Sequence, residues 1–201
     1  MAADHDTAQK APDDPRRHKL LEAAFTVFTR YGFRKASMDE VARAAQVSRQ
    51  GLYLHFATKE DLFRAALQHT LETSLQAAVA SLGDAALPVE SRLVGGFDAW
   101  VGRYVGVMGA GASDLAEASA ALVGTMVSDH EERFTEAVAR VIRASGLLAA
   151  YKPAGLTARQ LAGTLQATAR GLKHGCATRA AFVEGMTVAA RMMCLPLGGS
   201  R

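Results

Sequence analysis

The chain has 201 residues, of which 49% are hydrophobic and 21% are charged, and its formal net charge is +3. This apolar share is enough for a buried core, and no apolar run reaches the roughly 18 residues that a membrane-spanning helix needs. The two cysteines, Cys176 and Cys194, are too few for a disulfide framework and favour a cytoplasmic location.

Residues 1–15 are polar, with four aspartates, two prolines and no apolar stretch. A segment of this composition cannot bury enough apolar surface to fold, and it lacks the apolar region of a secretory signal. We therefore expect a disordered polar tail before the first helix.

Two short helices joined by a tight turn are predicted near the N-terminus. Ser37 and Glu40 have the spacing of a capping box, in which each side chain bonds the other residue's backbone amide. Met38, Val41 and Ala42 then repeat with the i, i+3, i+4 spacing of an apolar helix face.

The second of these helices is short and polar on one side. Ser48 is its expected N-cap, and Leu52 and Phe56, four residues apart, define its buried side. The opposite side carries side chains that hydrogen-bond to phosphates and base edges: Arg49, Gln50, Tyr53 and His55. This arrangement is typical of the recognition helix of a helix-turn-helix motif.

The positive charge of the chain is concentrated around this motif. Residues 16–64 hold ten basic and five acidic residues, a net charge of +5, whereas residues 65–201 hold twelve basic and eleven acidic residues. A basic domain with a recognition helix favours nucleic acid as the partner.

Helical spacing continues through the rest of the chain, and we find no alternating strand pattern or internal repeat. Thr58 and Asp61 have capping spacing and begin a long helix that residues 84–88 end. Further helices are expected at 89–108, 115–123, 128–146, 157–172 and 178–193. The predicted fold is all-α with about nine helices, three in an N-terminal helix-turn-helix domain and about six in a C-terminal bundle.

The N-terminal motifs resemble those of the TetR (tetracycline repressor) family of bacterial transcriptional regulators over about residues 17–67. The matching segments are Leu20-Leu21-Glu22-Ala23-Ala24-Phe25, Tyr31-Gly32-Phe33, Ser37-Met38, Val41-Ala42-Arg43-Ala44-Ala45, Val47-Ser48, Leu52-Tyr53-Leu54-His55-Phe56 and Lys59-Glu60-Asp61-Leu62-Phe63. The resemblance implies a DNA-binding domain at 16–64 and a helical ligand-binding and dimerisation domain at 65–201, after the tail at 1–15.

Two residues depart from the pattern of the family. Gln46 stands in the turn where the family commonly has glycine, and Gly51 stands where it often has a small hydroxyl residue. If the turn needs a left-handed backbone, Gln46 costs on the order of 1 kcal/mol. The DNA sequence read by other members therefore does not carry over.

We expect nine residues to contact double-stranded DNA. Those predicted to bind phosphates are Arg17, Ser37, Tyr53, His55 and Lys59, with Ser48 capping the recognition helix and also touching phosphate. Arg49, Gln50 and Gly51 are expected to face the bases, with arginine to guanine and glutamine to adenine as the favoured pairings.

The resemblance also implies a ligand pocket inside the C-terminal bundle. We expect mainly apolar walls from Phe97, Trp100, Tyr104, Met126 and Phe134, with His130, Arg170 or His174 as polar contacts for the ligand. Glycines in the segment 89–108 are interpreted as leaving space beside the large side chains. The alternative is that the aromatic residues are core and the glycines allow close helix packing.

Small residues on the last two helices favour close helix approach, and the resemblance implies that these helices pair two copies of the chain across a two-fold axis. A homodimer would present two recognition helices to a palindromic operator with half-sites about 34–36 Å apart or a multiple of that distance.

Catalytic and metal motifs are incomplete. Residues 106–113 have the glycine spacing of a phosphate-binding loop, but Ala112 stands where its lysine must be. The segment that begins at His130 has Phe134 in place of the second histidine of a zinc-protease helix, and His174 with Cys176 has no second ligand pair. We predict no enzyme activity, no cofactor and no metal.

The predicted function is a transcriptional repressor, associated with the nucleoid when bound to DNA and released from its operator by a small, mainly apolar ligand. One alternative is an architectural or cell-division DNA-binding protein of the same fold without an inducer. The other is an enzyme or carrier that uses the helical bundle.

Overall fold

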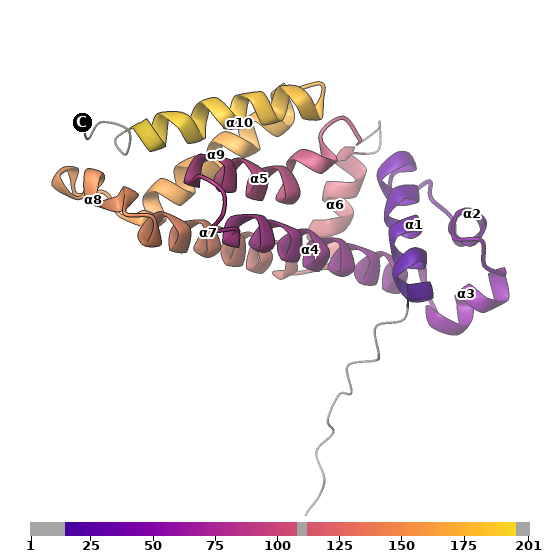
Figure 1. Cartoon of the computed structure of the whole chain (residues 1–201). Coiled ribbons are helices and arrows are strands. Elements are labelled where there is room, and N and C mark those ends of the chain that lie inside the picture. The colour runs from indigo at the N-terminus through magenta and orange to yellow at the C-terminus, as the bar shows by residue number, and fades with distance from the viewer. Residues whose placement is uncertain (1–14, 108–111, 196–201) are drawn as a thin grey trace, which may run out of the picture.

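The computed structural model describes residues 15–107 and 112–195, and within them it contains ten α-helices and no strand (Figure 1). The prediction of an all-α fold is therefore confirmed. The polar tail expected at 1–15 lies almost wholly outside the described residues.

Three helices form an N-terminal unit: α1 (Pro15–Tyr31), α2 (Met38–Ala44) and α3 (Arg49–His55). Ser37 and Glu40 form the predicted capping box before α2, and the Ser48 side chain caps α3. Phe28, Val41 and Leu52 are fully buried among these helices. The polar side of α3 therefore faces away from the core, at one end of the molecule (Figure 1).

The helix α4 (Lys59–Gly83) runs from the N-terminal unit into the C-terminal helices, beginning after the predicted cap at Thr58. The remaining helices are α5 (Val89–Trp100), α6 (Ala112–Leu122), α7 (Met126–Ala144), α8 (Leu147–Tyr151), α9 (Ala158–Gly175) and α10 (Arg179–Cys194), with 3-10 turns at Gly102–Tyr104 and Lys152–Ala154. Thr157 and Thr178 cap α9 and α10.

Two helix predictions need correction, and one helix was not predicted. The helix expected at 89–108 ends at Trp100, because the backbone leaves the helical region at Val101 (φ −122°) and continues as a 3-10 turn. The helix expected from Ser128 already begins at Met126, and the Ser128 hydroxyl donates to the Thr125 carbonyl instead of capping. The five-residue α8, which follows a left-handed Gly146, was not predicted.

Two apolar clusters share α4. Leu62 and Phe63 belong to the core of the N-terminal unit, whereas Leu75 and Ala78, further along the same helix, belong to the core of the C-terminal helices. The expected domain boundary at residues 64 and 65 thus falls inside one continuous helix. A movement of α4 would therefore displace residues of both cores.

The glycines of α5 allow close packing against α4. A Cβ atom on Gly96 would lie 2.7 Å from Cγ of Leu82, which is closer than van der Waals contact permits. Gly95 faces Ser81 in the same way. These two glycines do not leave space for a ligand, so the alternative interpretation of close helix packing is the correct one here.

Candidate functional site

The outer face of α3 is the first candidate site. Leu52 is fully buried on the inner side, and Ser48 Oγ accepts a hydrogen bond from the Gly51 amide at 3.0 Å. Gln50 and His55 are exposed, and Tyr53 is 42% exposed. The helix therefore presents donors, acceptors and an aromatic ring to a partner while its apolar side fixes its position.

Arg49 lies across the two helices of the motif. Its Nη1 donates to Oδ2 of Asp39 at 3.0 Å, and its guanidinium carbon lies 5.7 Å from the Tyr53 ring centroid. Exposed ion pairs of this kind contribute at most about 1 kcal/mol. Arg49 can therefore leave Asp39 at low cost for a base or a phosphate.

The predicted residues Arg17, Ser37 and Gly51 flank this face. The guanidinium of Arg17 lies 5.8 Å from the Phe56 ring centroid, which places it beside the C-terminal end of α3. The Ser37 hydroxyl donates to Glu40 Oε2 at 2.9 Å, and the Ser37 amide donates to the same oxygen at 2.8 Å. These two hydrogen bonds hold the pKa of Glu40 below its usual value. A Cβ on Gly51 would lie 3.0 Å from Ser48 Oγ, so a larger residue would crowd the cap.

Lys59 has a different environment from the other predicted contacts. Its ammonium donates to the carbonyls of Phe33 at 2.9 Å, Ala36 at 3.1 Å and Arg34 at 3.4 Å, and it lies 4.5 Å from the Phe33 ring centroid. All three N–H donors thus have acceptors in the loop between α1 and α2. A phosphate contact by Lys59 stays a prediction and would require the loss of at least one of these bonds.

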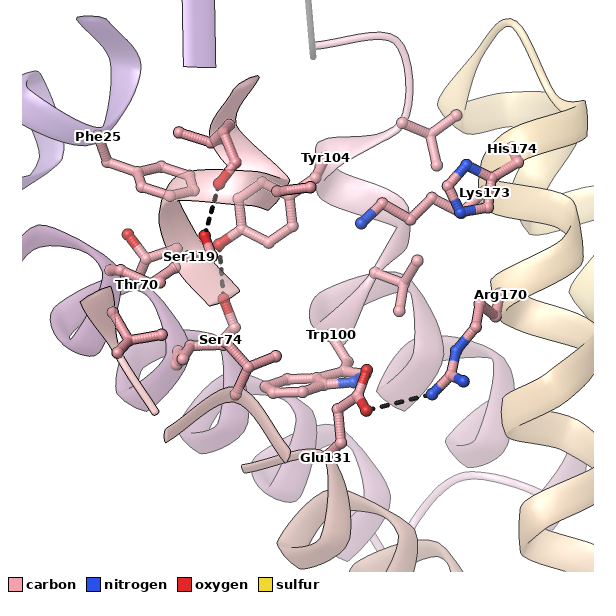
Figure 2. Close-up of a pocket in the computed structure, with 18 of the residues that line it drawn as sticks. Phe25, Thr70, Ser74, Trp100, Tyr104, Ser119, Glu131, Arg170, Lys173 and His174 are labelled. Carbon is pink, nitrogen blue, oxygen red and sulfur yellow. Dashed lines mark hydrogen bonds and ion pairs between the residues drawn. The ribbon is translucent and has the colours of Figure 1, made fainter. Parts of the chain in front are cut away.

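A cavity of about 790 Å³ lies between the N-terminal unit and the C-terminal helices. Its walls come from α1, α4, α5 with the 3-10 turn after it, α6, α7 and α9. Four of the predicted ligand residues line it: Trp100, Tyr104, Arg170 and His174 (Figure 2).

The other four predicted ligand residues do not line this cavity. Phe97 and Phe134 are fully buried and pack edge to face at 5.0 Å, behind Trp100. The ring of His130 bonds the Met126 carbonyl at 2.7 Å through Nδ1, and Met126 packs toward the N-terminal core. These four residues lie on helix faces turned toward other helices, and a ligand contact by them stays a prediction.

Several lining residues were missed from sequence. Phe25 of α1 and Ser74 of α4 had no distinguishing pattern, because each belongs to a helix whose cavity face is set only by packing. Ser74 and Tyr104 share a hydrogen bond of 2.6 Å between their hydroxyls. Lys173 and Glu131 also line the cavity, and Lys173, beside the predicted His174, could have been found from its i, i+3 spacing to Arg170.

The cavity is charged at the end formed by α9. Arg170 Nη2 donates to Oε2 of Glu131 at 3.1 Å. Burial lowers the pKa of Lys173, with Arg170 acting in the same direction and Glu131 opposing it. The charge of this cluster is therefore only partly balanced.

The helix α6 connects the cavity to the N-terminal unit. Leu115 and Ser119 line the cavity, and Leu115 also belongs to the N-terminal core. Near the two ends of α6, the Arg34 amide donates to Asp114 Oδ2 at 2.8 Å, and Arg64 Nε donates to the Leu122 carbonyl at 3.2 Å. A ligand that contacts α6 would thus contact a helix that is hydrogen-bonded to the N-terminal unit.

Residues 15–107 and 112–195 are the part of the chain that the structure describes. Within them, no group of three or more His, Cys, Asp or Glu side chains could hold a metal ion. Among the helices of the same ranges, none has the length and apolar character needed to cross a membrane.

Residues 20–66 match the family model described as bacterial regulatory proteins, tetR family. A stretch of 67 residues is 39% identical to the uncharacterized HTH-type transcriptional regulator YfiR of Bacillus subtilis, covering 33% of each chain. Another of 63 residues is 44% identical to the HTH-type transcriptional activator FasR of Mycolicibacterium smegmatis, covering 31% of this chain and 29% of FasR. The chain thus spans about a third of the length of these curated relatives.

Solved structures are similar over nearly the whole chain. A TetR-like transcriptional regulator from Rhodococcus sp. RHA1 is 26% identical with a TM-score of 0.59, over 92% of this chain and 97% of that one. The fatty acid degradation regulator FadR from Bacillus halodurans, at 16% identity, has a TM-score of 0.63 over 94% and 97% of the two chains. The second comparison speaks for the fold alone.

Proposed function

Since the chain belongs to the TetR family of bacterial regulatory proteins, we propose that it is a sequence-specific transcriptional regulator that binds double-stranded DNA through α3. The observation that carries the proposal is the exposed polar face of α3 on a buried apolar base. We assign it the role of a repressor that a small ligand releases from a palindromic operator.

In this proposal the residues of the interface divide into two roles. Arg49 and Gln50 read base edges in the major groove, with Gly51 beside them, because the N-terminal residues of a recognition helix reach the bases. The residues that bind phosphates are Arg17, Ser37, Ser48, Tyr53, His55 and Lys59; they set position and give salt-dependent affinity.

The proposed assembly is a homodimer through α9 and α10. Val188 and Met192 of α10 and Leu195 directly after it are each more than half exposed in the single chain. On α9, a Cβ added to Gly163 or Gly171 would meet no atom within 4 Å. A second copy would cover these apolar and small residues and pair two α3 helices on one duplex.

The cavity supports the ligand-responsive form of the proposal over an architectural DNA-binding protein, because it lies against both α4 and α6. These helices belong to the core of the N-terminal unit, so a ligand that moves them would change the distance between the two α3 helices. A hundredfold release of DNA needs about 2.7 kcal/mol of differential ligand binding. FasR and the similar protein from Rhodococcus sp. RHA1 are described as a transcriptional activator and a transcriptional regulator, which speaks against an enzyme or carrier.

The test is selection from random oligonucleotides at low ionic strength, followed by two variants. Arg49→Ala should relax base preference at one position per half-site. Arg17→Ala should weaken all sequences alike and lower the slope of log K against log salt by about 0.9 per lost phosphate contact. Enrichment of no symmetric sequence would end the proposal, and equal loss of preference in both variants would refute the division of roles.

A further inference from the structure

We propose that the ligand of the cavity is an amphiphile with one anionic group, a carboxylate or its equivalent, bound at Lys173 with Arg170 and His174 beside it. This inference rests on the proposed function, in which the cavity is the effector site, and it names the chemical class of that effector.

The three basic side chains share one face of α9. Arg170, Lys173 and His174 follow the i, i+3, i+4 spacing that places residues together on a helix surface, and all three line the cavity. Figure 2 shows them on the side of the cavity opposite Phe25 and Ser74. The only acid among the described lining residues is Glu131 of α7. Arg170 and Lys173 together outweigh Glu131 by one positive charge.

Lys173 is the unbalanced member of the cluster. Glu131 already accepts from Arg170 at 3.1 Å, and Lys173 has no hydrogen bond or ion pair with any residue that the structure describes. Lys173 is half-buried, and burial lowers the pKa of its ammonium. A buried charge is unfavourable unless it is paired, so a ligand anion would complete the cluster and raise this pKa again.

Away from this cluster the walls of the cavity are mainly apolar. Leu67, Leu71, Trp100, Val105, Leu115 and Val123 line it. The hydroxyls of Ser74 and Tyr104 already bond each other at 2.6 Å, so they do not require a polar group of the ligand. A volume of about 790 Å³ lies within the range of small-molecule pockets and far exceeds the size of an inorganic anion.

The experiment titrates the full chain, without DNA, with decanoate and with decanol, which share an alkyl chain and differ in charge. Trp100, the only tryptophan, lines the cavity and reports binding through its emission. We expect decanoate to bind at least about tenfold more tightly than decanol. Lys173→Met should bring the two affinities to within about threefold and leave that of decanol unchanged.

Two control variants separate charge from shape. Lys173→Arg keeps the charge and should keep the preference for decanoate. Lys152→Met makes the same charge change at an exposed residue outside the cavity and should also keep it. A thermal melt of each variant establishes that it is folded. If Lys173→Met is unfolded, Lys173→Gln removes the same charge and takes its place in the test.

Three results would overturn the inference: equal affinities in the unsubstituted chain, a preference that survives Lys173→Met, or no change in Trp100 emission with either compound. None of these affects the selection of operator DNA. Conversely, a preference for decanoate in a chain that selects no symmetric DNA would overturn the proposed function and leave the ligand class standing.

Discussion

Gln46 is the one residue other than glycine, among those the structure describes, with a positive φ. Its φ of 56° lies in the left-handed region, where a side chain costs roughly 1–2 kcal/mol. The strain is located in the turn between α2 and α3, and therefore at the base of the proposed DNA contact. The turn thus has, at Gln46, the left-handed backbone conformation that glycine favours.

Gln46→Gly should raise the free energy of unfolding by about 0.5–1 kcal/mol, because the relief of strain exceeds the extra entropy of the unfolded chain. Urea unfolding followed by circular dichroism measures it. Gln76→Gly on the exposed side of α4 is the matched control and should cost about 1 kcal/mol. A fall in stability in both variants would show that Gln46 is not strained.

At the scale of elements, the loop between α1 and α2 is held to the start of α4 by Lys59. A cation at the first turn of a helix is disfavoured by the helix dipole, so the three loop carbonyls are what stabilise it there. The position of α2, and with it of α3, depends on these bonds.

Lys59→Met should therefore lower the unfolding free energy by about 1.5–3 kcal/mol, the range for hydrogen bonds to charged groups. Differential scanning fluorimetry and urea titration check the loss. Lys19→Met, at an exposed residue of α1, should change stability by less than about 0.5 kcal/mol. If the two variants are equally stable, the carbonyl contacts of Lys59 contribute nothing to the fold.

The contact between α1 and α4 contains a histidine pair. The rings of His18 and His69 are 4.7 Å apart, and Nε2 of His69 is buried with no partner among the described residues. Burial lowers the pKa of His69 below its ordinary value of 6.5; His18 and Arg17 act in the same direction, and Glu22 with Glu72 opposes them.

Stability should consequently fall as the pH drops below 6.5, because the unfolded chain takes up a proton that the folded chain resists. His69→Phe should reduce this fall, measured as the difference between urea midpoints at pH 7.5 and pH 5.5. His55→Phe, at an exposed position, should leave the difference as it is. An unchanged pH dependence in His69→Phe would assign it to other groups.

At the scale of the whole molecule, the proposed dimer depends on the outer side of α10. Val188 is 56% exposed in the single chain, so a charge there costs the protomer little. Across a two-fold axis the same charge enters the interface from both copies.

Val188→Glu should weaken the dimer at least tenfold, about 1.4 kcal/mol, with little change in the melting of the protomer. Sedimentation velocity at micromolar concentration gives the oligomeric state. Val79→Glu, at a residue of α4 that is 41% exposed, should remain dimeric. A dimer of Val188→Glu as stable as the unsubstituted one would move the interface elsewhere.

The sequence by itself determined the helices and the N-terminal motif. The caps at Ser37, Ser48 and Thr58 were found where expected, because a cap and an apolar face depend on residues within one or two turns. The same local rules gave the exposed side of α3. They failed at Trp100, where the chain leaves the helix to pass α10.

Only the tertiary structure decided which side chains surround the cavity and where Lys59 points. Six segments line the cavity, and no local pattern tells which face of each helix is turned toward it. Phe97 and Trp100 are three residues apart, yet Phe97 packs in the core and Trp100 reaches the cavity wall. Contacts between residues distant in sequence arise from the packing of whole helices, which local spacing does not encode.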